Sequence, residues 1–140
     1  MGRILSIDYG LKRTGIAVTD PLQIIATGLT TVKTQDLFPF LRDYLEKEVV
    51  ELILVGEPKN WDESDTHATS LVRKFIRRLE KEFPAMPVKT IDERYSSKMA
   101  RDSMLEMGLK KKQRRNKGLV DEIAAAMLLQ EFLRMRDSGF

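Results

Sequence analysis

Residues 3–20 read RILSIDYGLKRTGIAVTD, and this stretch decides how the rest of the chain folds. Its β-branched and apolar residues predict two strands, at 3–9 and 14–19, joined by a tight turn that begins at Gly10. Asp8 follows large aliphatic residues near the end of the first strand, which we expect to be buried on both faces. A buried carboxylate is costly unless it is paired, hydrogen-bonded or bound to a metal. Asp8 is therefore the first candidate functional residue.

The composition predicts a single domain that spans residues 1–140. At 42% hydrophobic, the chain holds enough apolar material for a core. It shows no stretch long enough to span a membrane, no signal-peptide pattern and no cysteine for a disulfide or a thiolate metal site. We therefore expect a cytoplasmic protein without a membrane partner. The net charge of +3 is too small to identify a partner by itself.

The remaining chain predicts one mixed five-stranded sheet covered by helices, an α/β fold. A third extended run at 24–32 completes an antiparallel meander, and short apolar strands follow at 52–55 and 88–91. A right-handed crossover would set the strand at 52–55 beside the first strand, and parallel to it. The predicted helices cover residues 37–45, 64–83, 96–107 and 119–136.

Acidic residues follow the strands of this sheet that run parallel. Asp8 ends the first strand, and Glu57 and Glu93 come just after the fourth and fifth. Ligands of open α/β sheets bind outside these carboxyl ends. Asp121 is predicted in the first turn of the last helix, where the small side chains of residues 124–126 allow close packing on the sheet. We therefore expect Asp8, Glu93 and Asp121 to lie close together.

These three carboxylates suit a divalent metal site. Oxygen ligands without His or Cys favour Mg²⁺ or Mn²⁺ over zinc. A carboxylate cage with one or two such ions serves in-line attack on a phosphodiester. Each acid also has a structural interpretation, because Asp121 could stabilise a helix N-terminus and Glu93 could pair with Arg94. Asp8, at a strand end, has few such explanations.

Basic residues predict contact with a polyanion. Six cations and no acid lie between Gly108 and Gly118, although a solvated basic loop is the alternative. They are Lys110, Lys111, Lys112, Arg114, Arg115 and Lys117. Lys12 and Arg13, in the first hairpin turn, flank Asp8 and could bind a phosphate. His67, the only histidine, has no partner at ligand spacing, and we expect it to be exposed.

A nucleotide-binding fold is the main alternative for the opening hairpin. An Asp-x-Gly hairpin also begins the sugar-kinase and actin-like ATPases. Those proteins need two such domains, and 140 residues supply one. The chain also lacks a Walker A motif and a GxGxxG fingerprint.

Four motifs together resemble the YqgF family of ribonuclease H-like proteins. They are IDYGLKRTGIAVTD, VGEPKNWDES, DERYSS and VDEIAAAMLLQEFL, and they span nearly the whole chain. The family is described as Holliday junction resolvases and as nucleases that process the 5′ end of pre-16S ribosomal RNA. The resemblance implies a ribonuclease H-like fold and an endonuclease in which Asp8, Glu93 and Asp121 bind Mg²⁺ or Mn²⁺. It also matches the basic residues Lys12, Arg13 and Arg94 to positions of the family motifs.

One departure from the family pattern concerns Glu57. The family usually has VGLP where this chain has VGEP. Because related resolvases carry an acid at the end of this strand, Glu57 could be a supplementary ligand. We expect instead an exposed carboxylate in a loop.

Three functions stay open on the sequence alone. The first is a metal-dependent nuclease acting on structured RNA, a ribosome precursor, in which residues 110–117 grip backbone phosphates. The second is a resolvase of four-way DNA junctions, which needs a two-fold dimer, whereas we expect a monomer or weak dimer. The third is a nucleic-acid-binding factor of ribosome assembly or transcription without catalytic activity.

Overall fold

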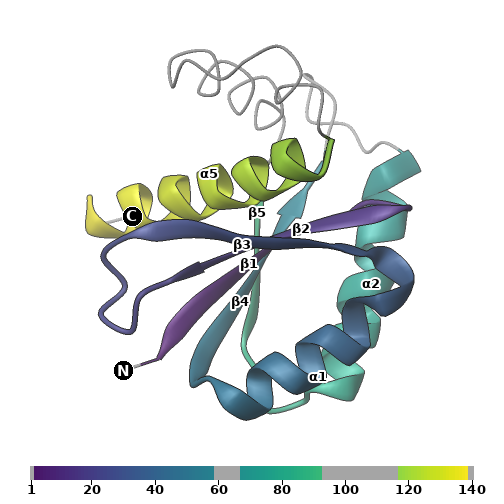
Figure 1. The fold of residues 1–140 in the computed structure, drawn as a ribbon, viewed down its shortest axis with the longest axis horizontal. Helices are drawn as coiled ribbons and strands as arrows, with labels where there is room; N and C mark the ends of the chain where they lie inside the picture. The colour runs from purple at the N-terminus through teal and green to yellow at the C-terminus, as the bar shows by residue number, and fades with distance from the viewer. Residues whose placement is uncertain (1, 59–66, 93–116, 139–140) are drawn as a thin grey trace.

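The computed structural model describes residues 2–58, 67–92 and 117–138, which form a mixed sheet with helices on both faces (Figure 1). The strands are β1 (Arg3–Asp8), β2 (Arg13–Thr19), β3 (Ala26–Lys33), β4 (Val50–Glu57) and β5 (Val88–Asp92). The helices are a 3₁₀ turn, η1 (Thr34–Asp36), and the α-helices α1 (Leu37–Lys47), α2 (His67–Glu82) and α5 (Lys117–Asp137). The helix predicted at 96–107 lies outside the described residues.

The strand order is β3-β2-β1-β4-β5. β1 pairs antiparallel with β2, and β2 antiparallel with β3, whereas β1 and β4, and then β4 and β5, run parallel. The predicted α/β class, with a mixed five-stranded sheet, is therefore confirmed. β4 lies beside β1, as the right-handed crossover rule predicts. Because β1, β4 and β5 run in the same direction, their carboxyl ends lie together at one end of the sheet.

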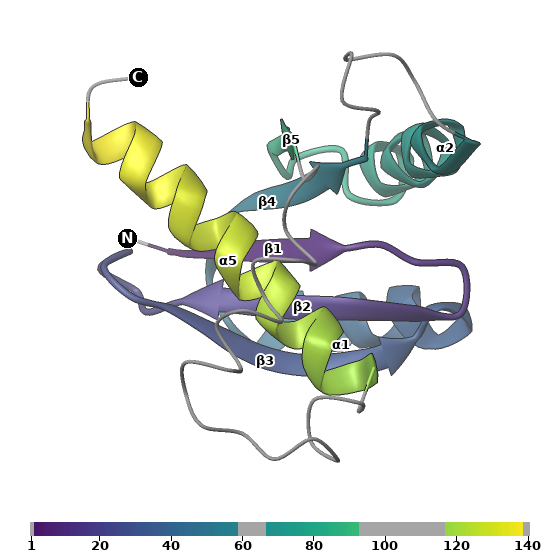
Figure 2. The same ribbon diagram turned by 90° about the horizontal axis from the view of Figure 1, so that it is seen from above.

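α1 and α2 cover one face of the sheet and α5 covers the other (Figure 2). β1 is buried on both sides because its residues alternate between the two layers. Leu5 and Ile7 pack against α1 and α2, whereas Ile4 packs against α5. On the α1–α2 side, Phe75 stacks on Tyr9, with ring centroids 4.5 Å apart. The prediction that β1 is buried on both faces is confirmed.

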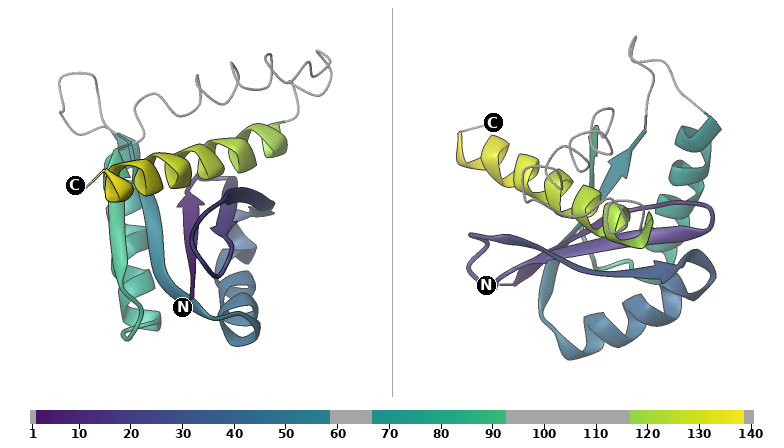
Figure 3. Two further views of the ribbon diagram at one scale, coloured as in Figure 1. Left: turned by 90° about the vertical axis from the view of Figure 1, so that its left-hand side faces the viewer. Right: turned by 45° about the horizontal axis from the view of Figure 1, so that its top comes forward.

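α5 crosses the sheet obliquely, over β2, β3 and β1 (Figure 3). The helical spacing of apolar residues predicts that one face of this helix packs on the core, namely Val120, Ile123, Ala124, Met127, Leu128 and Phe132. Of these, Ala124 and Leu128 are buried. Other predicted core residues, such as Met127, are only half-buried, and Leu129 and Leu133 are buried instead. The predicted face is therefore partly wrong. The helix carries apolar side chains on most sides, so its periodicity does not single out one face.

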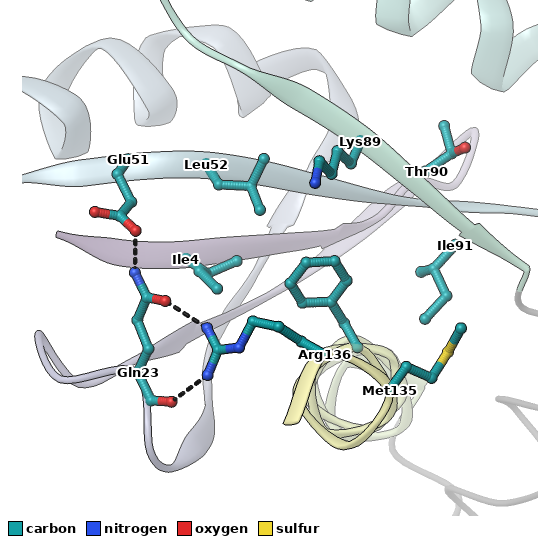
Figure 4. Close-up of a pocket in the computed structure, with 10 residues that line it drawn as sticks. Ile4, Gln23, Glu51, Leu52, Lys89, Thr90, Ile91, Met135 and Arg136 are labelled. Carbon is teal, nitrogen blue, oxygen red and sulfur yellow. Dashed lines mark hydrogen bonds between the residues drawn. The ribbon is translucent and has the colours of Figure 1, made fainter. Parts of the chain in front are cut away.

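A hydrogen-bond network around Gln23 attaches the C-terminal part of α5 to the sheet. Gln23 is buried and has a positive φ of 58°, which is uncommon for a residue with a side chain. Its amide nitrogen donates to the Gly2 carbonyl oxygen at 2.8 Å and to Glu51. Arg136 donates to the side-chain oxygen of Gln23 at 2.5 Å and to its main-chain oxygen at 3.2 Å (Figure 4). These bonds oppose sliding of α5 along the sheet.

Candidate active site

Asp8 is the last residue of β1, and its main chain pairs with Gly15 of β2. Side chains alternate along a strand, so Asp8 lies on the same face as Ile4, which packs against α5. Gly15 lies directly opposite Asp8 and shares that face. Asp8 is half-buried at the open end of the strand. The structure therefore places this carboxylate under the N-terminal half of α5.

The main chain of α5 makes its closest approach to the sheet at Gly15. A Cβ atom at this position would lie 2.1 Å from the carbonyl oxygen of Asp121 and 2.4 Å from its carbonyl carbon. Only a residue without a side chain permits this contact. Directly opposite residues of antiparallel strands have Cβ positions about 5 Å apart. Asp121 therefore lies over the residue that pairs with Asp8, and these two predicted site residues come together.

A second contact positions the start of α5. The Thr31 hydroxyl, on β3, donates to the main-chain oxygen of Gly118 at 2.5 Å. Helix α5 begins at Lys117, so Asp121 lies beyond the first turn and the predicted first-turn position is wrong. The electrostatic effect of a helix N-terminus falls off within that turn. A helix-end role therefore accounts poorly for Asp121.

Arg13 pairs with Asp121 across the site. Its Nε donates to Oδ2 of Asp121 at 3.2 Å, between side chains that are 39% and 25% exposed. Arg13 is the first residue of β2, two residues before Gly15 and on the same face. The expected position of Arg13 beside Asp8 stays a prediction, and the ion pair that the structure shows is with Asp121. The positive charge of Arg13 compensates the negative charge of Asp121, which lies close to the sheet because α5 packs closely there.

Glu57 lies on the opposite face from Asp8. It is the last residue of β4, pairs in register with Asp92 and shares the face of Val55, which packs against α1 and α2. Its carboxylate forms an ion pair with Arg73 of α2 at 3.4 Å, and its side chain is only 16% exposed. The prediction of an exposed loop carboxylate is wrong, because β4 continues through this residue. Glu57 is not brought together with Asp8.

Several predicted residues lie outside the part of the chain that the structure describes. They are Glu93, Arg94, Lys110, Lys111, Lys112, Arg114 and Arg115. Lys117 begins α5 instead of ending a basic loop. Within residues 2–58, 67–92 and 117–138, no group of three acidic, His or Cys side chains is arranged to hold a metal ion. Lys12 and His67 are exposed, as predicted for His67.

Sequence reasoning missed Gly15 as part of the site. The available signal was a glycine within a strand otherwise rich in β-branched residues. Such a glycine often marks the close approach of another backbone or a ligand. Locating that approach requires knowing which helix lies above it.

A family model described as "RuvX: Holliday junction resolvase" matches residues 2–135. The chain belongs to the RuvX family. This RuvX protein is 53% identical over 133 residues to a Flavobacterium psychrophilum protein named as a candidate pre-16S rRNA nuclease, covering 95% of this chain and 97% of the relative. A Phocaeicola vulgatus protein with the same name is 52% identical over 136 residues, with coverages of 97% and 98%. The resemblance to the YqgF family is thereby confirmed.

The fold of this RuvX protein is also found in RuvC. Its structure is similar to T. thermophilus RuvC in complex with a Holliday junction substrate, with a TM-score of 0.61, 18% identity and coverages of 99% and 98%. A second Thermus thermophilus RuvC structure gives a TM-score of 0.55, 17% identity and coverages of 97% and 96%. The predicted ribonuclease H-like fold is confirmed. No helix in the described part of the RuvX chain is long and apolar enough to cross a membrane.

Proposed function

We propose that this chain is a metal-dependent nuclease that hydrolyses phosphodiester bonds in structured RNA, with the 5′ end of pre-16S rRNA as its substrate. The observation that carries the proposal is the close approach of α5 at Gly15, which sets Asp121 beside Asp8 at the carboxyl end of β1. Membership of the RuvX family and the names of the relatives support a nuclease. Those names also favour RNA as the substrate.

The described residues fit a hard divalent cation. Asp8 and Asp121 offer carboxylate oxygens from two elements, and the missing Cβ at Gly15 makes room for their approach. Mg²⁺ is usually bound by one or two protein carboxylates together with substrate phosphates. We propose Glu93, which follows β5 directly, as the third ligand. When bound, Mg²⁺ or Mn²⁺ supplies Lewis-acid stabilisation of the reacting phosphate and a nucleophile at neutral pH.

The basic residues beside the acids bind and orient the substrate. Arg13 uses one of its five donor N–H groups on Asp121, so the same guanidinium has donors for a phosphate oxygen. Lys12 is exposed in the hairpin turn, next to Arg13 in the sequence. Arg94 and the cations at 110–117 contact the flanking backbone. Because these contacts neutralise phosphates, RNA affinity falls steeply with salt.

Cleavage of a labelled pre-16S rRNA fragment in Mg²⁺ tests the proposal. We expect Asp8→Asn to lower the rate more than about 100-fold, because even changes to residues behind a metal ligand cost 10- to 100-fold. Asp43→Asn is the matched control, since this exposed α1 carboxylate pairs with Lys47 at 3.0 Å, on the side of the sheet away from α5. Equal cleavage by wild type and Asp8→Asn would indicate a contaminant and refute the assignment.

Junction resolution is the second candidate, favoured by the family description and the likeness to RuvC. Paired symmetric nicks in a four-way DNA junction require a two-fold dimer. A labelled junction assayed beside the RNA, with sedimentation analysis of the protein, separates the two functions. Paired nicks from a dimer would favour a resolvase. RNA binding without cleavage or Mn²⁺ uptake would favour a non-catalytic factor over either enzyme.

A further inference from the structure

A cleft of about 490 Å³ adjoins the β1–β2 turn. Its lining brings together cations from two separate segments of the chain. The lining residues are Leu11, Lys12, Arg13, Lys33 and Gln35. The first three belong to the β1–β2 turn and the start of β2, and the other two to the corner where β3 leads into η1.

Hydrogen bonds between the two segments shape this cleft. The Thr34 N–H donates to the main-chain oxygen of Lys12 at 3.0 Å, and the Thr34 hydroxyl donates to that of Gly10 at 2.5 Å. The hydroxyls of Thr34 and Thr14 also lie 2.9 Å apart. Thr14 is buried and Thr34 half-buried. The positions of the cations are therefore set by the fold, whereas their long side chains stay free to adapt.

Lys33 faces Arg13 directly across the β2–β3 ladder. Residues that are directly opposite project on the same face, and like charges in this position are destabilising. An anion between them removes that repulsion. Thr31, two residues before Lys33, contacts α5, so Lys33 also lies on the α5 face. The cleft thus lies on the same face of the sheet as Asp8 and Asp121.

Arg13 connects the cleft to the acids, because it lines the cleft and also pairs with Asp121. A nucleic-acid strand with one phosphate at Asp8 and Asp121 could continue past Arg13 into the cleft. Leu11 is 70% exposed there and offers an apolar contact for a sugar or a base. Lys33 and Gln35 supply a charge and hydrogen-bonding groups for a phosphate.

We infer that Lys33 and Gln35, with Lys12, form a phosphate subsite that holds a backbone phosphate flanking the one to be cleaved. This inference rests on the proposed function, because it takes the acids to mark the position of the reacting phosphate. The contact is to the backbone, so the subsite reads no base sequence. It sets the path of the strand toward the β3 edge of the sheet.

The test measures RNA affinity against KCl concentration, with a labelled single-stranded RNA that lacks terminal phosphates and without divalent metal. Loss of one phosphate contact lowers the slope of log K against log[salt] by about 0.7 for a single strand. We expect this change for Lys33→Gln and a wild-type slope for Lys33→Arg. Gln35→Ala should weaken binding without changing the slope, because glutamine is neutral. DNA of the same sequence should respond alike.

Lys89→Gln is the matched control. Lys89 is an exposed lysine on β5, the opposite edge strand, and its replacement removes the same charge. An unchanged slope for a folded Lys33→Gln protein, or equal changes in the Lys33→Gln and Lys89→Gln proteins, would overturn the subsite. No cleavage is measured, so the two proposals fail separately. If the protein is an active nuclease but the Lys33→Gln slope is unchanged, only the subsite proposal is refuted. If the slope changes but the protein has no nuclease activity, the subsite proposal is supported and the proposed function is refuted.

Discussion

Replacing Gly15 with alanine tests whether close packing of α5 builds the site. The new Cβ would lie 2.1 Å from the carbonyl oxygen of Asp121 and 3.0 Å from its Cβ. Ordinary contact distances are about 3.5 Å, so the helix main chain must retreat by roughly 1 Å. Rotation of a side chain cannot relieve the clash, because the nearest atoms belong to the backbone. The N-terminal half of α5 therefore has to move, and Asp121 with it.

The retreat has a cost in stability and a cost at the site. Overpacking of a close contact destabilises a protein by about 1–3 kcal/mol. A displacement of about 1 Å in a catalytic arrangement costs on the order of 100-fold in rate. We therefore expect Gly15→Ala to lower the free energy of unfolding by about 1–3 kcal/mol. We also expect it to weaken Mn²⁺ binding by at least about 10-fold, because Asp121 moves away from Asp8.

Gly28→Ala is the matched control. Gly28 also lies on a strand beneath α5, but a Cβ there would be 3.4 Å from the nearest atoms of Glu122, an ordinary contact. Both substitutions reduce the conformational freedom of the unfolded chain to a similar degree, so this effect cancels in the comparison. We expect Gly28→Ala to stay within about 0.5 kcal/mol of wild type. Urea unfolding measures stability, and calorimetry measures Mn²⁺ affinity.

Two results would refute this reasoning. If the Gly15→Ala and Gly28→Ala proteins unfold at the same urea concentration, the main chain of α5 does not rest on Gly15. If the Gly15→Ala protein is destabilised but binds Mn²⁺ as wild type does, the contact packs the helix without building the site.

Three further predictions concern stability. Phe75→Ala removes a ring that is 4% exposed and should cost about 3–5 kcal/mol in urea unfolding. The N–H of Ile25, with others in the same turn, holds the pKa of Asp20 below its ordinary value of 3.8. The ionised Asp20 carboxylate therefore stabilises the folded protein at pH values above its unfolded pKa, and this stabilisation is lost as pH falls through its folded pKa. In the Asp20→Asn protein, the free energy of unfolding should therefore depend less on pH below about pH 4. Arg136→Met removes the guanidinium that donates a hydrogen bond to the side-chain oxygen of buried Gln23. Thermal unfolding should show that the free energy of unfolding falls by about 1–3 kcal/mol.

Local patterns were sufficient for most of the fold. The continuous apolar run of β1, the break near Gly10 and the short apolar run in β4 all appear in neighbouring residues. The right-handed crossover rule then set β4 beside β1 without further information. The ends of the strands and helices were predicted less accurately. β4 continues through Glu57 because pairing with Asp92 extends it, and that partner lies far along the chain.

The candidate site was predictable as a set of residue types and less so as a geometry. Asp8 stood out because a carboxylate at the end of a buried strand requires a reason. Asp121 could be named as its partner, but its distance from the helix start was misjudged. Glu57 and Asp8 both end parallel strands, yet they project to opposite faces. Their faces can be told apart only by following the alternation of side chains along each strand, starting from residues of that strand whose face is known.

The sequence by itself determined the five strands, the antiparallel meander of the first three and the position of β4 beside β1, because these depend on short-range periodicity and general rules of chain connection. The tertiary structure alone decided which face of α5 is buried, since the helix is apolar on most sides. It also decided that Gly15 receives the main chain of Asp121 and that Lys33 lies opposite Arg13. Those contacts join residues that are distant in sequence, and they exist only once helix and strands are packed together.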